Sequence, residues 1–171
     1  PYQHGEVYVL DDGAETDRNN PRTLALKRLA DVADGDQVWL AGSTQEPEES
    51  YVIDAFSKLA GVYPQLRLIL VPRHPERFDE VAQLLTESGL PWQRRTELGE
   101  APGDHGQTRV LLVDAMGELG AWWGVASIAY VGGSLGSRGG QNMIEPAAYG
   151  AAVCFGPNTR NFRDIVSRLK E

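Results

Sequence analysis

Cysteine, histidine and basic residues are all scarce in this chain of 171 residues. A single cysteine, Cys154, excludes an internal disulfide framework and a zinc site of clustered cysteines. His4 and His105 have no companions at the spacing of metal ligands, so no metal site is predicted. The 16 Lys and Arg residues face 24 Asp and Glu residues, for a net charge of −8. This balance disfavours a general binder of the nucleic-acid backbone and leaves room for a local pocket that binds a small anion.

Long apolar runs are also missing. The run at residues 68–71 is too short to span a bilayer, and the run at residues 121–131 is interrupted by glycine. The chain opens with Pro1 and Tyr2 and shows no signal peptide. Apolar residues make up 42% and charged residues 23%, which excludes intrinsic disorder and indicates one globular domain, or one lobe of a larger protein.

Short apolar runs alternate with amphipathic stretches along the chain. We predict strands at residues 7–10, 37–42, 67–71, 92–96, 109–113, 128–131 and 152–155, and helices at residues 21–33, 48–60, 75–88, 116–125, 142–149 and 158–171. Residues 97–108 are predicted to form a loop. The strand runs are apolar on both faces, and the connections are long enough for helices. This pattern predicts an α/β fold, a Rossmann-like doubly wound parallel sheet with helices on both faces.

Ligands of such sheets bind beyond the carboxyl ends of the strands, where this sequence has four unusual segments. The first is Gly42, Ser43 and Thr44, whose N–H groups and hydroxyls suit a phosphate, although a simple helix cap is the better reading of this segment alone. In the second, Arg73 and His74 stand between two prolines. The guanidinium suits a phosphate or carboxylate, and a plain surface loop is an equally good interpretation.

The third segment, residues 116–118, can offer backbone N–H groups to a ligand, whereas burial of Met116 with a first-turn charge on Glu118 is favoured in isolation. The fourth, residues 132–146, is rich in glycine and leads to Glu145. A carboxylate there matches the two hydroxyls of a ribose, and this functional reading is preferred over a glycine hinge. Cys154 is expected to be a small core residue.

Together these segments resemble a known family. Residues 41–44 (AGST), 71–78 (VPRHPERF), 114–119 (DAMGEL), 132–146 and 156–162 resemble, in this order, the C-terminal half of 3-deoxy-D-manno-octulosonic acid (Kdo) transferase. The resemblance covers about residues 39–162. It implies the C-terminal lobe of a GT-B glycosyltransferase, with residues 1–171 forming a single nucleotide-sugar (donor) binding domain, truncated at both ends relative to the parent enzyme.

The resemblance also implies a function. The parent enzyme would be an inverting transferase that needs no metal or cofactor and moves Kdo from CMP-Kdo to a lipid A precursor in lipopolysaccharide biosynthesis, at the cytoplasmic face of the bacterial inner membrane. Its general base and acceptor site would lie in an N-terminal lobe that this chain lacks. The isolated domain is therefore expected to be soluble and inactive, with no catalytic residue of its own and no nucleic acid as partner.

Residues of this chain can be assigned to the donor site only through the resemblance. The expected contacts to CMP-Kdo are Pro72, Arg73, Met116, Gly117, Glu118, Asn142, Met143, Ile144 and Glu145, with weaker candidates Ser43, Thr44, His74, Gly133, Ser134 and Gln141. Arg73 would contact the phosphate and Glu145 the ribose. Gln141 replaces the family's usual His, and Met143 and Ile144 replace its common Pro-Leu pair.

Two alternatives remain open at this point. One is the donor-binding lobe of another GT-B glycosyltransferase that uses a UDP-sugar. The other is a non-catalytic nucleotide-binding module. An NAD-dependent dehydrogenase is disfavoured, because no Gly-x-Gly-x-x-Gly follows the first strand.

Overall fold

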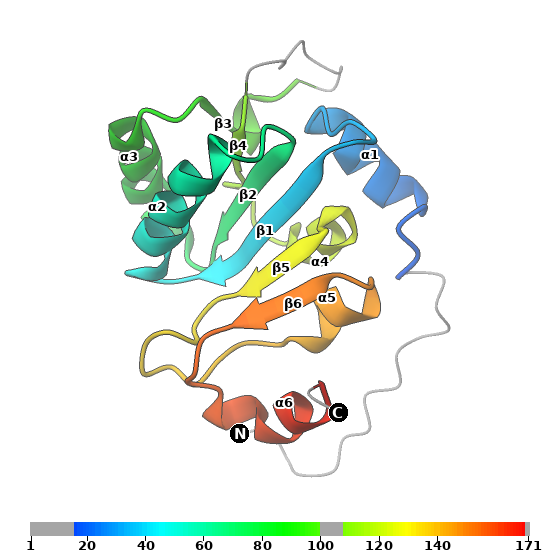
Figure 1. Ribbon diagram of the computed structural model, residues 1–171, viewed down its shortest axis with the longest axis vertical. Helices are drawn as coiled ribbons and strands as arrows, with labels where there is room; N and C mark the ends of the chain where they lie inside the picture. The colour runs from blue at the N-terminus through cyan, green and yellow to red at the C-terminus, as the bar shows by residue number, and fades with distance from the viewer. Residues whose placement is uncertain (1–15, 100–107, 170–171) are drawn as a thin grey trace.

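A parallel sheet forms the centre of the computed structural model, which describes residues 16–99 and 108–169 (Figure 1). Within these residues the sheet has six strands in the order β3-β4-β2-β1-β5-β6. They are β1 (Gln37–Thr44), β2 (Leu66–Pro72), β3 (Trp92–Arg94), β4 (Val110–Leu112), β5 (Ile128–Val131) and β6 (Ala152–Phe155). Every pairing is parallel, so the predicted α/β fold is confirmed. The strand predicted at residues 7–10 and most of the predicted loop lie outside the described residues.

The strand order reverses beside the central strand β1. Leu40 pairs with Ile69 of β2 on one side and with Ala129 of β5 on the other. In a doubly wound sheet the two connections leave such a point in opposite directions and open a crevice beyond the carboxyl ends of the strands. All predicted strands within the described residues are present, because buried parallel strands show themselves as continuous apolar runs.

The helices are α1 (Pro21–Leu29), α2 (Glu48–Ala60), α3 (Phe78–Ser88), α4 (Leu119–Trp122), α5 (Ile144–Ala148) and α6 (Arg163–Leu169). Short 3₁₀ helices are η1 (Pro75–Arg77), η2 (Arg95–Glu97), η3 (Trp123–Val125) and η4 (Arg160–Phe162). The helix predicted at residues 116–125 therefore starts later and continues as η3. Gly117, at φ +79°, precludes a helical start at residue 116. The helix predicted at 21–33 ends early, with Asp31 at φ +50°.

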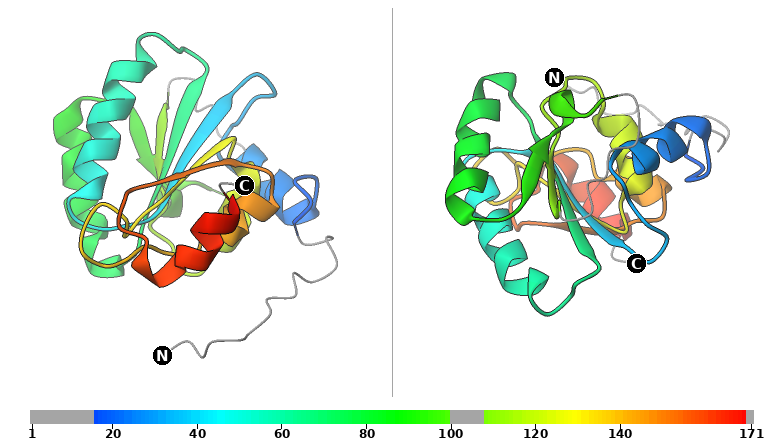
Figure 2. Two further views of the ribbon diagram at one scale, coloured as in Figure 1. Left: turned by 60° about the horizontal axis from the view of Figure 1, so that its bottom comes forward. Right: turned by 90° about the horizontal axis from the view of Figure 1, so that it is seen from above.

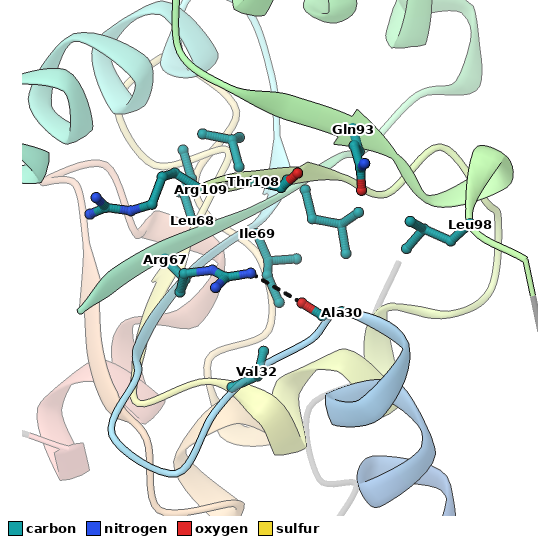
Figure 3. A pocket seen from close by; sticks show the side chains of 11 residues that line it. Ala30, Val32, Arg67, Leu68, Ile69, Gln93, Leu98, Thr108 and Arg109 are labelled. Atoms are coloured by element: carbon teal, nitrogen blue, oxygen red, sulfur yellow. Dashed lines mark hydrogen bonds between the residues drawn. The ribbon is translucent and has the colours of Figure 1, made fainter. Parts of the chain in front are cut away.

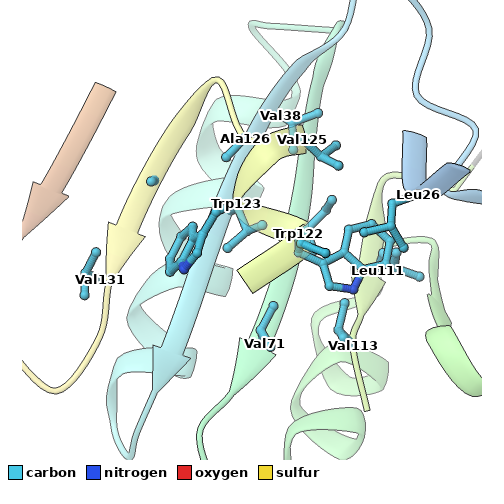
Figure 4. Packing of buried hydrophobic residues seen from close by; sticks show 14 of the residues in the cluster. Leu26, Val38, Val71, Leu111, Val113, Trp122, Trp123, Val125, Ala126 and Val131 are labelled. Carbon is cyan, nitrogen blue, oxygen red and sulfur yellow. The ribbon is translucent and has the colours of Figure 1, made fainter. Parts of the chain in front are cut away.

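Helices cover both faces of the sheet (Figure 2), and a hydrophobic cluster fills the space on each side. On one face α2 and α3 bury Phe56 and Leu85 against the strands. On the other face lie α1, α4, α5 and α6, where Trp122 and Trp123 fill the space beneath β1 and β2 (Figure 4). The prediction that Cys154 is a core residue is wrong, because β6 is an edge strand and leaves this side chain exposed. None of the helices in residues 16–99 and 108–169 has the length and apolar character needed to cross a bilayer.

Candidate functional site

The carboxyl ends of four adjacent strands bring the predicted segments to one edge of the sheet (Figure 1). Backbone hydrogen bonds join these ends in series: Val113 N–H to Leu70 O, Arg73 N–H to Thr44 O and Gly132 N–H to Gly42 O, each at 2.9 Å. The four segments that follow β4, β2, β1 and β5 are therefore neighbours in space. The series joins residues between Gly42 and Gly132, up to 90 positions apart in the sequence, into one surface.

A hollow of ≈ 570 Å³ opens between α1, α4 and α5. Its lining includes Gly117 beside the start of α4 and Glu145 on α5, so it joins two of the predicted site segments. Its full lining is Thr16, Asn20, Pro21, Arg22, Gly117, Gly120, Ala121, Glu145, Ala148 and Tyr149. The volume lies within the range usual for small-molecule sites in proteins.

Residues 16–22 form a wall of the hollow that sequence reasoning missed. Arg18 holds this wall in place, because its guanidinium donates to Tyr149 O at 2.6 Å and to Ala126 O at 2.5 Å. Arg22, on the first turn of α1, adds a cation to the lining. Nothing local in the sequence signals these contacts, because they join segments more than 100 residues apart.

Asn142 shapes the turn that carries Glu145. Its side-chain oxygen accepts from Ile144 N–H at 3.0 Å, and its amide nitrogen donates to Glu145 Oε1 at 3.1 Å. Glu145 is otherwise exposed, whereas Met143 is completely buried in the core and Ile144 is half-buried. Of the segment predicted to bind a ligand, Glu145 is thus the side chain with free acceptor capacity toward the solvent.

In the segment after β4, Met116 and Gly117 are open to solvent, whereas Glu118 makes internal hydrogen bonds. Met116 is 64% exposed, and Gly117 leaves its backbone open to solvent. Glu118 is already engaged: it accepts from Arg95 Nε and Nη2, each at 3.1 Å, and from Trp122 Nε1 at 3.0 Å. Its carboxylate therefore fixes η2 to α4, and the backbone near Gly117 is the part of this segment most accessible to a ligand.

Arg73 follows β2 with an exposed side chain. Within the described residues its guanidinium has no ion-pair or hydrogen-bond partner, whereas the nearby Arg77 is held by Glu49 and Glu80. The hydrogen bond to Glu80 raises the pKa of Arg77 against the effect of its partial burial, and Glu49 adds to the rise. His74 Nδ1 lies 3.9 Å from Glu76 Oε1, and Pro72 is buried at the end of β2. Arg73 is therefore the cation of this loop that can bind an external anion.

The weaker candidates lie deeper in the structure. Ser43, at φ +54°, and Thr44 are buried at the end of β1. Ser134 is buried as well, and its hydroxyl links β5 to the chain beyond β6 by donating to Val131 O and accepting from Gly156 N–H. Gly133 is buried beside it, and Gln141 is half-buried. These positions shape the loop around the site, and a direct contact with a ligand stays a prediction for each.

A second cavity lies away from all predicted site residues (Figure 3). It measures ≈ 20 Å³ and is lined mainly by apolar groups from β2, β4 and the chain after α1. Arg67 reaches across it to donate to Ala30 O at 3.2 Å. A space of this size holds little more than one water molecule, so it is not a candidate site. Among the described residues no three His, Cys, Asp or Glu side chains gather as potential metal ligands.

The sheet and its strand-end segments define a class: a Rossmann-like α/β domain whose predicted site segments follow the carboxyl ends of the strands. No family model matches the chain. The chain is 42% identical over 134 residues to the 3-deoxy-D-manno-octulosonic acid transferase of Haemophilus influenzae, covering 78% of this chain and 31% of that protein. The transferase of Bordetella pertussis is also 42% identical, over 135 residues, with 77% and 31% covered.

A solved structure shows the same relationship. The crystal structure of the C-terminal CMP-Kdo binding domain of WaaA from Acinetobacter baumannii superimposes with a TM-score of 0.76 at 34% identity, covering 86% of this chain and 78% of that one. The chain therefore belongs to the 3-deoxy-D-manno-octulosonic acid (Kdo) transferase family, where it corresponds to the C-terminal domain. The resemblance seen in the sequence is confirmed. The chain spans about a third of the length of the curated relatives it matches.

Proposed function

We propose that this chain is a single domain that binds the donor CMP-Kdo and serves a Kdo transferase. The observation that carries the proposal is the hollow shared by Gly117 and Glu145, two residues that belong to separate motifs of the family resemblance. The 34% identity to a domain described as CMP-Kdo binding supports the same ligand. Within the whole enzyme, the acceptor would be a lipid A precursor bound by an N-terminal lobe, at the cytoplasmic face of the inner membrane.

Each side chain then has a defined part. Glu145, an exposed carboxylate that only accepts hydrogen bonds, binds the ribose hydroxyls. The backbone at Gly117 approaches the nucleoside closely because no side chain stands there. The guanidinium of Arg73 binds the phosphate.

The transfer reaction follows from this arrangement. A hydroxyl of the acceptor attacks the anomeric carbon of Kdo, the bond from that carbon to the phosphate oxygen breaks, and CMP leaves with the electron pair. Arg73 stabilises the negative charge that develops on the leaving phosphate. The proton of the acceptor hydroxyl passes to a base supplied by the N-terminal lobe.

The test is a calorimetric titration of CMP, UMP and cytidine into the chain and its variants. Arg73→Ala should weaken CMP binding by about tenfold or more and leave cytidine binding unchanged, because a charge-assisted hydrogen bond contributes ~1.5–3 kcal/mol. Glu145→Ala should weaken both ligands, because both carry the ribose. Asp54→Ala, a change to an exposed acid on α2 paired with Lys58, is the matched control.

Three results would speak against the proposal. Equal affinity of the unmodified chain for CMP and UMP would point to a donor with another base. An Arg73→Ala variant that loses cytidine and CMP binding alike would remove the phosphate role. A Glu145→Ala variant that binds as tightly as Asp54→Ala would place the nucleoside elsewhere.

A further inference from the structure

Glu48, the first residue of α2, is a buried carboxylate that is only 1% exposed. Within the described parts of the chain it accepts hydrogen bonds from five groups. Oε1 accepts from Tyr130 Oη at 2.9 Å and from the N–H groups of Ser134 and Leu135, each at 3.0 Å. Oε2 accepts from Gly133 N–H at 2.8 Å and Gln45 N–H at 3.0 Å.

The chemistry of these contacts matches an ionised carboxylate. Four of the partners are backbone N–H groups, which only donate, and the fifth is a phenol. Burial raises the pKa of Tyr130, and the charge of Glu48 raises it further, so the phenol stays protonated and donates. Hydrogen bonds of this charge-assisted kind are roughly twice as strong as neutral ones.

The bonds anchor the start of a loop whose far end is held by Asn161, which donates to Arg138 O and Gly139 O. Consecutive N–H groups at residues 133–135 turn toward the same carboxylate, with Gly133 at φ +72°. Such a run of N–H groups forms a concave anion site in many proteins. Here an internal side chain fills that site, so the loop is anchored to α2 across more than 80 residues of sequence.

The anchored loop continues to the ligand-binding turn by a short chain of hydrogen bonds. Gly133 O accepts from Gly140 N–H at 2.8 Å, which closes the loop upon itself. Gly140 lies two residues before Asn142, and Asn142 donates to Glu145 Oε1. The position of Glu145 is therefore linked to Glu48 through Gly133, Gly140 and Asn142.

We propose that Glu48 is a positioning residue of the donor site: its buried carboxylate fixes the loop at residues 133–141 and thereby sets the position of Glu145. This inference rests on the proposed donor function, because it assigns Glu145 to the nucleoside. Glu48 touches no ligand itself. Its effect is on how well the ribose site is formed before the donor binds.

The neighbouring Glu49 provides a matched control. It is equally buried and lies on the same helix, yet its hydrogen bond goes to Arg77, with 2.9 Å between Oε2 and Nη1. Within the described residues no hydrogen bond or ion pair joins Glu49 to the glycine-rich loop. Replacement of either acid by its amide keeps the side-chain volume and disturbs a buried hydrogen-bonding group.

The experiment compares Glu48→Gln with Glu49→Gln in the ¹⁵N-labelled chain, first without ligand and then with CMP. Glu48→Gln should shift the amide resonances of residues 133–135 and of residues 142–145, because one oxygen becomes an NH₂ group that faces N–H donors. CMP binding should weaken about tenfold, within the range of coupling through a packed network. Glu49→Gln should leave these resonances and the affinity for CMP unchanged, even if it lowers the unfolding temperature as much as Glu48→Gln does.

The contrary results are distinct from one another. The inference is overturned if the shifts stop at residue 135, or if Glu48→Gln binds CMP as tightly as Glu49→Gln. If the unmodified chain does not bind CMP, the proposed donor function fails, while the ligand-free resonances still decide whether Glu48 controls residues 142–145. If Glu48→Gln does not fold, Tyr130→Phe removes one donor to Glu48 and should produce the same shifts at smaller size. Unchanged resonances at residues 142–145 in that variant contradict the inference.

Discussion

Gly132, directly after β5, packs against the end of β1, and its replacement by alanine tests the geometry at these strand ends. A Cβ atom there would lie 2.4 Å from Ser43 O and 2.6 Å from Thr44 Cα. Both are backbone atoms of the central strand, which is fixed by the bonds from Gly132 N–H to Gly42 O and from Arg73 N–H to Thr44 O. Because no flexible side chain can move aside, relief requires a shift of one strand end.

Overpacking of this kind costs about 1–3 kcal/mol, and the close contact with backbone atoms of β1 places Gly132→Ala near ~3 kcal/mol. For a domain of this size each kcal/mol lowers the melting temperature by ~2–4 °C, so a loss of about 10 °C is expected. Thermal unfolding followed by circular dichroism measures it. Gly136→Ala is the control, since it lies in the same loop with no atom within 4 Å of its added Cβ. Equal melting temperatures for the two variants would refute the described packing of Gly132.

Two further predictions concern the ends of β4 and the hollow. Burial alone would raise the pKa of Asp114, but hydrogen bonds from Thr96 and from Arg94 lower it below the ordinary value of 3.8. The stabilising effect of the Asp114 carboxylate is therefore present above pH 3.8 and is lost as the pH falls through the lowered pKa. Measured by urea unfolding, Asp114→Asn should have a smaller unfolding free energy than the unmodified chain at pH 7, and this difference should shrink below pH 3.8. A difference that stays constant with pH would contradict this. Gly117→Ala should cost ~1 kcal/mol in unfolding free energy because φ is +79°, whereas Gly120→Ala, inside α4 and with open space around its Cβ, should be neutral or stabilising. A neutral Gly117→Ala would contradict the backbone geometry beside the hollow.

The strands were predictable because of where they lie. A strand such as β2 is covered on both faces, so nearly every position is apolar, and the sequence from Leu66 to Pro72 shows this directly. The order of the strands across the sheet cannot be recognised from such a pattern. Cys154 stands in an apolar run like the others, but within residues 16–99 and 108–169 β6 pairs with β5 alone, and Cys154 is exposed. An edge strand and a central strand differ in their neighbouring strands, and the local sequence pattern carries no information about these neighbours.

The helix starts were harder to predict for a similar reason. Periodicity across residues 116–125 indicates a helix correctly, yet the positive φ at Gly117 and the change to a 3₁₀ turn at Trp123 depend on how Trp122 and Trp123 pack under the sheet. The prediction of a helix at residues 48–60 was confirmed without revision. That helix buries Val52, Ile53 and Phe56 on one face.

Some residues of the candidate site could be predicted from the sequence and others could not. Gly117 and Glu145 could be selected from the sequence because each lies in an unusual segment that follows a strand, and the structure brings the two residues to one hollow. Glu48 could not, because an acid at the start of a helix is normally an exposed charge. Its burial results from partners on β5 and the following loop. The wall formed by residues 16–22 was missed because these residues meet the rest of the hollow through contacts with residues more than 100 positions away in the sequence.

The most direct test of the central claim is a crystal structure of the chain grown with CMP. The account predicts electron density for the nucleoside in the hollow between α4 and α5, with the ribose hydroxyls within hydrogen-bond distance of Glu145 and the phosphate toward Arg73. Density for CMP at any other surface, with the hollow occupied by solvent alone, would contradict it.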